Sequence, residues 1–342
     1  MILKNNDEIT LLRSLIDRFI LSLFFFLLFF HTACAQLIDM SIHEPQTLDM
    51  KFNATLVSTS RIKSILVKIS EKPDLQMIVD RGETQGYEFD STGKVIRFFA
   101  TRVISKEQVE TVHKAVYKKG RRISPAYTEV NWKYVFDTNF TWFMYDRSAR
   151  LIMKRSNYGD FYNTFYYDYD SLGKLSKETN CKETNKNPDK HHFELGVQTI
   201  LSQESFEYVM QSPTQIKKRC LNDDGKVYKQ GIINRDSNSV EEDFSFVVGY
   251  VRYTNRYTYD NSGKLIEKMN YTNSNGDMKV TRTFQYDENG NITEERININ
   301  DVNTGMMAYI YDPEQRLLKS RLERDFGKAN IEILKFIYEF YP

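Results

Sequence analysis

The sequence predicts an all-β protein in which repeated β-hairpins form a curved, largely single-layer antiparallel sheet. One phrase occurs seven times: two aromatic residues two apart, then Asp, Gly and an aliphatic residue. It is clearest at Tyr257, Tyr259, Asp260, Gly263 and Leu265. Three of the six intervals between successive copies are about 25 residues, a recurring spacing that is typical of repeat architectures. The chain also holds 22 Tyr and 23 Phe, which favour strands.

The first 35 residues are predicted to be a signal peptide. Residues 19–30 are apolar except for Ser22, a run too short to span a bilayer but suited to a signal peptide. Ala33, Cys34 and Ala35 form an A-x-A cleavage site that would release a chain beginning at Gln36. Residues 32–34 also resemble a lipobox, which would lipidate Cys34, and an uncleaved anchor is a third possibility. Each reading predicts export, to the periplasm, the cell surface or the medium.

The length of the chain is enough for one or two ordinary domains. Residues 36–56 carry little periodicity and are expected to be a linker or N-terminal edge, and residues 57–342 form the β-hairpin repeat domain. Residues 105–117 fit either a helix or a strand, with the strand favoured. Residues 178–195 are polar and are expected to be a surface loop.

Each copy of the repeated phrase predicts a tight hairpin. Asp accepts a hydrogen bond from the backbone two residues on, and Gly takes the left-handed conformation of a bulged turn. The aromatic residue before Asp then opposes the aliphatic residue, pairing Tyr259 with Leu265, Tyr286 with Ile292 and Tyr311 with Leu317. The outer aromatic residue is expected to oppose the position seven after Asp. The predicted turn residues are Asp90, Gly93, Asp146, Asp170, Gly173, Gly225, Asp260, Gly263, Asp287, Gly290 and Asp312.

The spacing of the copies is not uniform. Successive Asp positions lie 24, 27 and 25 residues apart in three cases, which fits one period. A degraded copy has Asn222 at the Asp position. It lies 52 residues after Asp170, about two periods, and 38 residues before Asp260, which no multiple of the period explains.

The phrase Tyr-x-Tyr-Asp-x-x-Gly-Lys-Leu resembles the YD repeats of Rhs-type bacterial proteins and similar repeats in exported proteins of the Bacteroidetes. The resemblance covers roughly residues 85–325. In the large Rhs family, such repeats wind a long β-sheet into a hollow shell around a toxin. This chain has too few copies for such a shell, so the resemblance implies a YD-repeat-like meander and export without toxin delivery.

Composition and motifs exclude several function classes. With 47 basic against 46 acidic residues, the chain lacks the basic footprint of a nucleic-acid binder. Catalytic and nucleotide-binding motifs such as G-x-S-x-G, H-E-x-x-H and Walker A are absent from the sequence. His191 and His192 near Cys181 match no zinc spacing, and turn capping explains the repeated Asp without calcium. We therefore expect no enzyme activity, cofactor or metal. Export makes a disulfide between Cys181 and Cys220 possible.

The expected function is that of a noncatalytic exported or cell-surface protein whose sheet presents an interaction surface. The candidate binding face consists of Trp132, Trp142, Tyr257, Phe284 and Tyr309, because aromatic rows stack on sugars or engage proteins. An envelope protein or a glycan is the expected partner, with membrane contact only through a lipid on Cys34. Two alternatives stay open: a glycan-acting enzyme with carboxylates from separate repeats, and an accessory or immunity protein of a toxin system.

Overall fold

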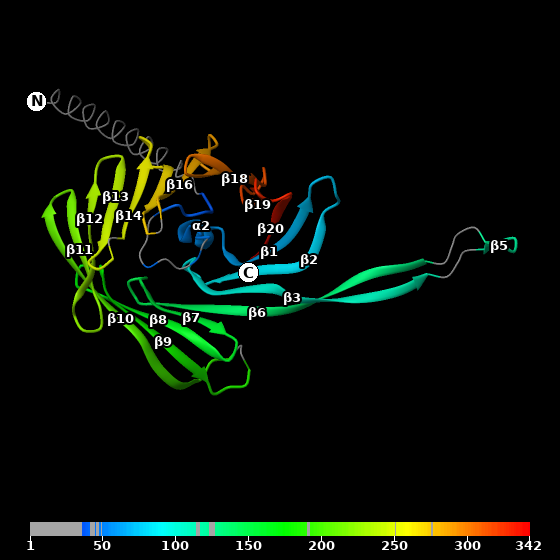
Figure 1. Ribbon diagram of the computed structural model, residues 1–342, viewed down its shortest axis with the longest axis horizontal. Coiled ribbons are helices and arrows are strands. Elements are labelled where there is room, and N and C mark those ends of the chain that lie inside the picture. The colour runs from blue at the N-terminus through cyan, green and yellow to red at the C-terminus, as the bar shows by residue number, and fades with distance from the viewer. Residues whose placement is uncertain are drawn as a thin grey trace, which may run out of the picture.

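The first and last strands of the chain pair with each other and close the sheet into a barrel. The computed structural model describes residues 36–41, 45, 48, 50–113, 117–122, 127–189, 192–249, 251–274 and 276–342. Within these residues, eighteen strands form one antiparallel sheet in which each strand pairs with the next along the chain. The last strand pairs with the first from Ile62 opposite Phe340 to Pro73 opposite Asn330 (Figure 1).

The strands of the barrel are β1 (Ile62–Pro73), β2 (Val79–Phe89), β3 (Val95–His113), β6 (Tyr127–Tyr145), β7 (Leu151–Tyr158), β8 (Phe161–Tyr169), β9 (Leu175–Asn185), β10 (Leu195–Ser212), β11 (Gln215–Leu221), β12 (Val227–Arg235), β13 (Ser239–Phe246), β14 (Arg252–Tyr259), β15 (Leu265–Thr272), β16 (Met278–Tyr286), β17 (Ile292–Ile299), β18 (Val302–Tyr311), β19 (Leu318–Asp325) and β20 (Asn330–Phe340). A two-stranded sheet of β4 (Tyr117–Lys118) and β5 (Arg121–Arg122) lies apart from the barrel, and α2 (Ala54–Thr59) precedes β1.

The protein is all-β, but the predicted open, single-layer sheet is wrong. An open sheet would leave the outer edges of β1 and β20 with unpaired backbone groups. Closure pairs those edges and places Ile65 and Val67 of β1 opposite Tyr338 and Phe336 of β20 on the inner face. Because the two strands come from opposite ends of the chain, no local pattern in the sequence predicts this pairing.

The turn at Asp260 has the geometry of a bulged hairpin. Gly263 donates its backbone N–H to the Asp260 carbonyl at 3.0 Å and has a φ of 83°. The Asp260 side chain accepts from the backbone N–H groups of Ser262 and Lys264 at 2.8 and 2.9 Å. Positive φ recurs at the corresponding positions of five other copies, which are Gly93, Ala149, Gly173, Gly225 and Gly290.

The register of the hairpins agrees with the sequence near the turn and departs from it farther out. Tyr259 opposes Leu265, as predicted, but a bulge then shifts the register so that Tyr257 opposes Lys268 and not Glu267. The other predicted inner pair in this region, Tyr286 with Ile292, also forms.

The last copy of the phrase has a longer turn. Its left-handed residue is Arg316, with a φ of 58°, and Arg316 donates its N–H to the carbonyl of Asp312 at 2.9 Å. Tyr311 therefore opposes Leu318, and the predicted pair with Leu317 is wrong. This copy has Gln315 at the Gly position, and one more residue is used to reverse the chain.

The irregular spacing of the copies follows from strand count. Copies 24 to 27 residues apart are separated by two strands, so their turns lie at the same end of the barrel. Three strands, β9 to β11, separate Asp170 from Asn222, and three more, β12 to β14, separate Asn222 from Asp260. The Asn222 turn therefore lies at the opposite end from the other six. We call the end that carries those six turns the turn end, and the opposite end the arm end.

We call the described residues between 36 and 59 the N-terminal segment. They lie inside the barrel, where α2 is surrounded by strands (Figure 1). Ile38 forms an isolated bridge with Phe52, and the Asn53 side chain caps α2 by accepting from the Leu56 N–H at 3.1 Å. Leu37 and Val57 are fully buried and belong to the main apolar core with inward residues of the wall. The stretch 36–56 was expected to be a linker or edge, but its described residues help to fill the interior.

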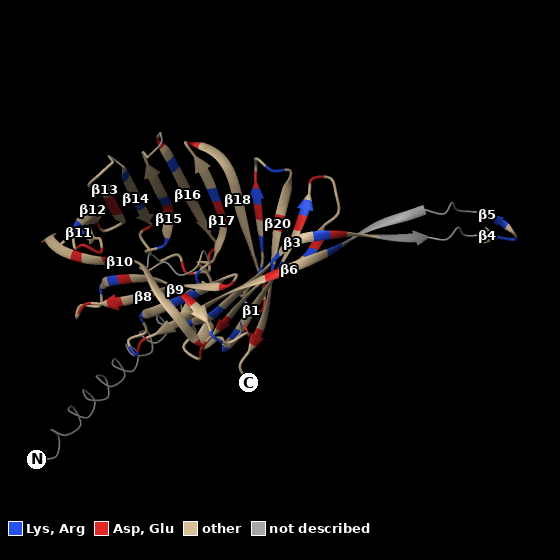
Figure 2. Cartoon of the chain, turned by 60° about the horizontal axis from the view of Figure 1, so that its bottom comes forward, with Lys and Arg blue, Asp and Glu red and all other residues tan. Residues whose placement is uncertain are grey.

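The two faces of the wall differ in chemistry. Inward positions of β14, β16 and β18 carry Tyr257, Phe284 and Tyr309, which are buried in the main core. The outer face carries charged pairs, including Arg256 with Glu241 on adjacent strands. Others are Arg252 with Asp243 and Lys63 with Glu339. Figure 2 shows Lys, Arg, Asp and Glu distributed along the strands.

Two further segments can be compared with their predicted structure. Residues 105–113 are part of β3, so the favoured strand is right for this stretch, and residues 114–116 lie outside the described residues. The predicted loop over 178–195 is only partly right: residues 178–185 belong to β9 and Leu195 begins β10, and the described residues between them connect the two strands. Within the described part of the chain, no helix is long and apolar enough to cross a membrane.

Contact between the turn of Gly93 and the N-terminal segment can be tested with a matched pair of substitutions. Gly93 and Gly263 have φ of 84° and 83°, so alanine strains both by about 1 kcal/mol. A Cβ on Gly93 would also lie 2.0 Å from the Ala54 carbonyl oxygen, whereas one on Gly263 would meet no atom within 4 Å. We expect Gly93→Ala to lower the free energy of unfolding in urea at least twice as much as Gly263→Ala. Equal losses would show that α2 does not pack on this turn.

Candidate functional site

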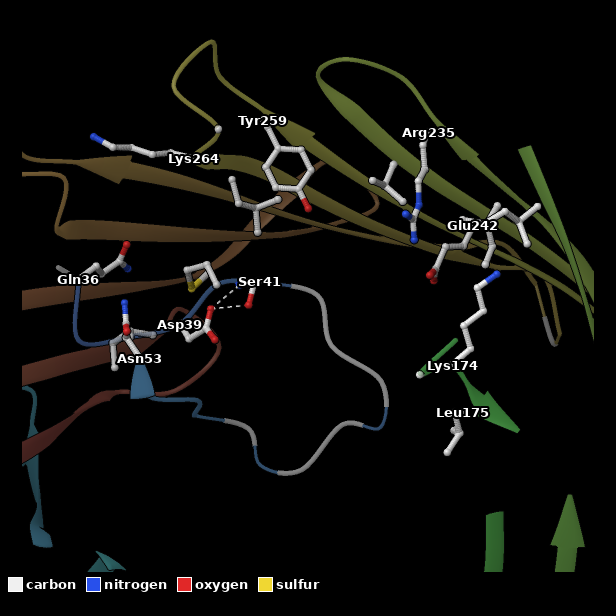
Figure 3. A pocket seen from close by; sticks show the side chains of 18 of the residues that line it. Gln36, Asp39, Ser41, Asn53, Lys174, Leu175, Arg235, Glu242, Tyr259 and Lys264 are labelled. Carbon is white, nitrogen blue, oxygen red and sulfur yellow. Dashed lines mark hydrogen bonds between the residues drawn. The ribbon is translucent and has the colours of Figure 1, made fainter. Parts of the chain in front are cut away.

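A cavity of about 700 Å³ lies at the turn end, between the N-terminal segment and the inner wall. Gln36, Asp39, Ser41 and Asn53 border it on one side, and side chains from β9 to β16 border it on the other (Figure 3). Its volume is within the range of small-molecule sites in proteins. The residues that bear charge or aromatic surface are Asp39, Lys174, Tyr208, Arg235, Glu242, Tyr259, Lys264 and Tyr286.

Two cations and one carboxylate converge on one wall of the cavity. Lys174 precedes β9, Arg235 ends β12 and Glu242 lies in β13, and Figure 3 shows their side chains pointing toward one another. The Lys174 Nζ lies 5.1 Å from the centre of the Tyr208 ring. Neither Lys174 nor Arg235 belongs to an ion pair within the described residues. This corner therefore offers positive charge to an anionic group.

Tyrosines supply the second wall. Burial raises the pKa of Tyr259, and it raises that of Tyr286 to about 12, so both hydroxyls stay protonated at neutral pH. The Tyr286 hydroxyl donates to the Leu265 carbonyl at 2.6 Å, which fixes its ring. The Tyr259 hydroxyl points into the cavity (Figure 3). The site thus combines aromatic surface with a hydroxyl donor.

The carboxylates of the cavity already have protein partners. Asp39 accepts from the Ser41 N–H at 2.9 Å and from its hydroxyl at 2.5 Å, which holds the local backbone. Glu242 accepts from the Asn255 side chain at 3.1 Å. The arrangement is suited to holding a ligand by charge, hydrogen bonds and ring contacts.

A second polar cluster lies on the opposite face of the wall from the inner core. Glu183 is fully buried there and accepts four hydrogen bonds, from Arg155 at 2.8 Å, Thr164 at 2.6 Å, Tyr166 at 2.6 Å and Gln198 at 2.8 Å. The Arg155 guanidinium lies 3.7 Å from the centre of the Phe193 ring, which helps to cover the cluster. With both carboxylate oxygens engaged, Glu183 holds strands β7 to β10 together.

The residues predicted to form a binding face do not lie on one face. Tyr257, Phe284 and Tyr309 are buried inside the barrel. Trp142 is on β6, opposite Arg97 and 5.8 and 5.9 Å from the rings of Phe140 and Tyr162. Trp132 opposes Gln108 farther along β6, and its side chain is outside the described residues. Cys34 is outside them as well.

The candidate metal and disulfide residues can also be placed. Cys181 and Cys220 are both buried, and no disulfide joins them in the structure. His192 contacts Asp189 at 2.7 Å, and His191 lies outside the described residues. Among the described residues, no group of three or more His, Cys, Asp or Glu is placed to hold a metal.

Sequence reasoning missed the cavity. Lys174 follows the Gly of a repeat, where Lys is common, so its position carried no distinguishing signal. Arg235 is the last residue of β12, and no sequence motif lies beside it. Only the closed barrel brings β9 and the β12–β13 hairpin to one space.

No protein-family model and no curated protein matches the chain. Among solved structures, the chain is similar to a porin-like protein from Bacteroides uniformis, with 11% identity and a TM-score of 0.36 over 81% of this chain and 98% of that chain. A porin-like protein from Bacteroides vulgatus has 9% identity and a TM-score of 0.29 over 59% and 94%. The Photorhabdus luminescens Tc holotoxin pore has 10% identity and a TM-score of 0.17 over 76% of this chain and 21% of that chain.

The resemblance to Rhs-type YD-repeat proteins is wrong as a family assignment. No family model matches the chain. The repeated phrase shapes hairpins in a closed barrel of eighteen strands within the described residues, not an open YD-repeat-like meander. At these identities and TM-scores, the matches assign no function to the chain.

The Glu183 cluster predicts a pH-dependent contribution to stability. Burial opposes ionisation of Glu183, but hydrogen bonds from Thr164, Tyr166, Arg155 and Gln198 outweigh it and lower the pKa. The folded protein therefore binds fewer protons than the unfolded chain near this pKa. Its stabilising contribution is present above the ordinary Glu pKa of about 4.3 and is lost as pH falls through the lower, folded value.

Glu183→Gln should lower the free energy of unfolding by about 3 kcal/mol at pH 7, because Arg155 loses its charged partner. The variant should also lose part of the fall in melting temperature between pH 5 and pH 3. Glu288→Gln, at an exposed turn, removes the same charge and serves as control. If the two variants have the same melting temperature at pH 7, the cluster does not stabilise the wall.

Proposed function

We propose that this protein is a noncatalytic, exported barrel of the cell envelope whose turn-end cavity binds an anionic saccharide. The observation that carries the proposal is the cavity itself, where Lys174 and Arg235 converge beside Tyr259. A sugar acid offers a carboxylate to the two cations. Its hydroxyls can pair with Glu242 and the Tyr259 hydroxyl, and its ring faces are suited to tyrosine side chains.

The envelope location is supported by the sequence. The apolar run over residues 19–30, followed by the A-x-A site, is typical of an exported chain. A lipid on Cys34 would tether the protein to a membrane. Gln36 lines the cavity at the turn end, so a tether just before it would lie at that end.

Charge on the outer wall supports a location in water. A wall in contact with lipid carries an apolar outer band, and charged residues there are costly. Here the outer face of β13 and β14 carries the ion pairs of Arg252 with Asp243 and Arg256 with Glu241. We infer that the barrel stands in the aqueous part of the envelope and that the cavity is reached from the turn end.

Binding can be measured by calorimetry with trigalacturonic acid as the anionic probe and maltotriose as the neutral one. We expect preference for the anionic sugar. Arg235→Gln should weaken its binding about tenfold, because a charge-assisted hydrogen bond is lost. Arg256→Gln removes the same charge from the outer wall and should leave the affinity unchanged.

Three results would count against this function. The proposal fails if neither sugar binds, if maltotriose binds equally well, or if the two arginine variants behave alike. Mass spectrometry of the incubated sugar tests the alternative of a glycan-acting enzyme, since Asp39 and Glu242 both line the cavity. Release of shorter fragments, lost in Glu242→Gln, would replace binding with hydrolysis.

A further inference from the structure

The arm end carries an exposed apolar tip where β1 turns into β2. Leu75, Met77 and Ile78 have side chains that are 104, 88 and 58% exposed, and Leu75 adopts a positive φ of 62°. The Asp74 N–H donates to the Ala329 carbonyl at 2.9 Å, and both Asp74 oxygens accept from Arg324 at 2.9 Å. The tip is thus anchored at its base while its large apolar side chains face solvent, an arrangement that marks an interaction site.

A two-stranded arm leaves the barrel at the same end. From Val103 opposite Phe136 to His113 opposite Tyr127, β3 and β6 pair only with each other, over about 35 Å at the usual rise per residue. Figure 1 shows this arm projecting beyond the barrel. A lone hairpin is marginally stable in water, so an arm of this length is suited to contact with a partner.

The end of the arm is strongly basic. Lys118 of β4, Lys119 of the turn and Arg121 of β5 lie close in sequence to an exposed Tyr117, and Arg122 follows in β5. Four cations within five residues stand out in a chain whose net charge is +1. Figure 2 shows the Lys and Arg residues at this tip. This concentration of charge is complementary to a surface of closely spaced phosphates.

Together these features match the two components of an anionic lipid surface. Exposed Leu, Met and Ile side chains can enter the boundary between headgroups and acyl chains. Lys and Arg contact the phosphates, and a tyrosine is suited to the interface because its ring is apolar and its hydroxyl is polar. We propose that the arm end of this barrel docks on a membrane rich in anionic phospholipid, through the β1–β2 tip and the basic end of the arm. This docking is independent of the cavity and of any lipid on Cys34.

The experiment uses the exported, mature protein with Cys34→Ala in every sample, so that no attached lipid contributes. Sedimentation with vesicles of phosphatidylglycerol and phosphatidylcholine is compared with vesicles of phosphatidylcholine alone. We expect binding to the anionic vesicles that weakens with added salt. Replacing Leu75 and Met77 with Ser should reduce it at least tenfold, as should replacing the four arm cations with Gln.

Matched controls separate docking from general effects. Leu172→Ser alters a leucine that is 80% exposed at the turn end. A variant with Gln at Lys63, Lys279, Arg256 and Arg296 removes four cations from the wall. Both controls should bind as before, and circular dichroism checks that every variant is folded. Equal binding to neutral vesicles, no binding, or equal losses in the control and arm-end variants would overturn the proposal, as would crosslinking of the tip to a protein in the absence of lipid binding.

Discussion

An eighteen-stranded barrel encloses more space than its own inward side chains can fill, and the rest of this structure depends on how that space is occupied. Barrels of about eight strands are filled by their side chains, whereas those of sixteen to eighteen leave a channel. Here the N-terminal segment, which precedes the first barrel strand, occupies part of the interior. Phe52 meets the rings of Tyr87 and Phe89 at 4.8 and 5.4 Å, and Leu37 and Val57 are fully buried. The cavity is the part of the interior that this segment leaves open.

In a water-filled barrel the inner side chains are polar and the outer ones apolar. In this barrel the distribution of the two kinds of side chain is largely the opposite. Aromatic side chains of the repeats face inward, where they meet the N-terminal segment and one another, and ion pairs such as Arg252 with Asp243 lie on the outer face. The charged residues that line the cavity are the exception on the inner face. Tyr257 illustrates the result. It has the pattern of a partly exposed strand residue in sequence, yet it is buried because the sheet curves around it. A residue's environment in this fold is therefore set by closure as much as by alternation along its strand.

The hairpins could be predicted from the sequence because residues close together in the chain determine each turn. Closure of the barrel could not be predicted, because it depends on the pairing of strands that are far apart in the chain. Tyr259 opposite Leu265 follows from Asp and Gly at fixed offsets, because a turn of known length sets the register. The turn before Leu318 has one more residue, and the same reasoning failed by one position. Closure of the barrel pairs β1 with β20, and curvature of the wall places Lys174 and Arg235 on the same cavity. Neither relation has a signal in the sequence, because each depends on the number of strands between the residues and not on their neighbours.

The pairing of the first and last strands also determines when the protein can fold. The Tyr341 hydroxyl donates to the Phe89 carbonyl at 2.6 Å across 252 residues, and its N–H donates to the Arg61 carbonyl. Until this C-terminal segment arrives, β1 has an unpaired edge and the space around α2 is open on one side. Contacts so distant in sequence form slowly, because the intervening chain must first be ordered. A chain threaded through a membrane from its N-terminus would therefore complete its core only after the final strand emerges.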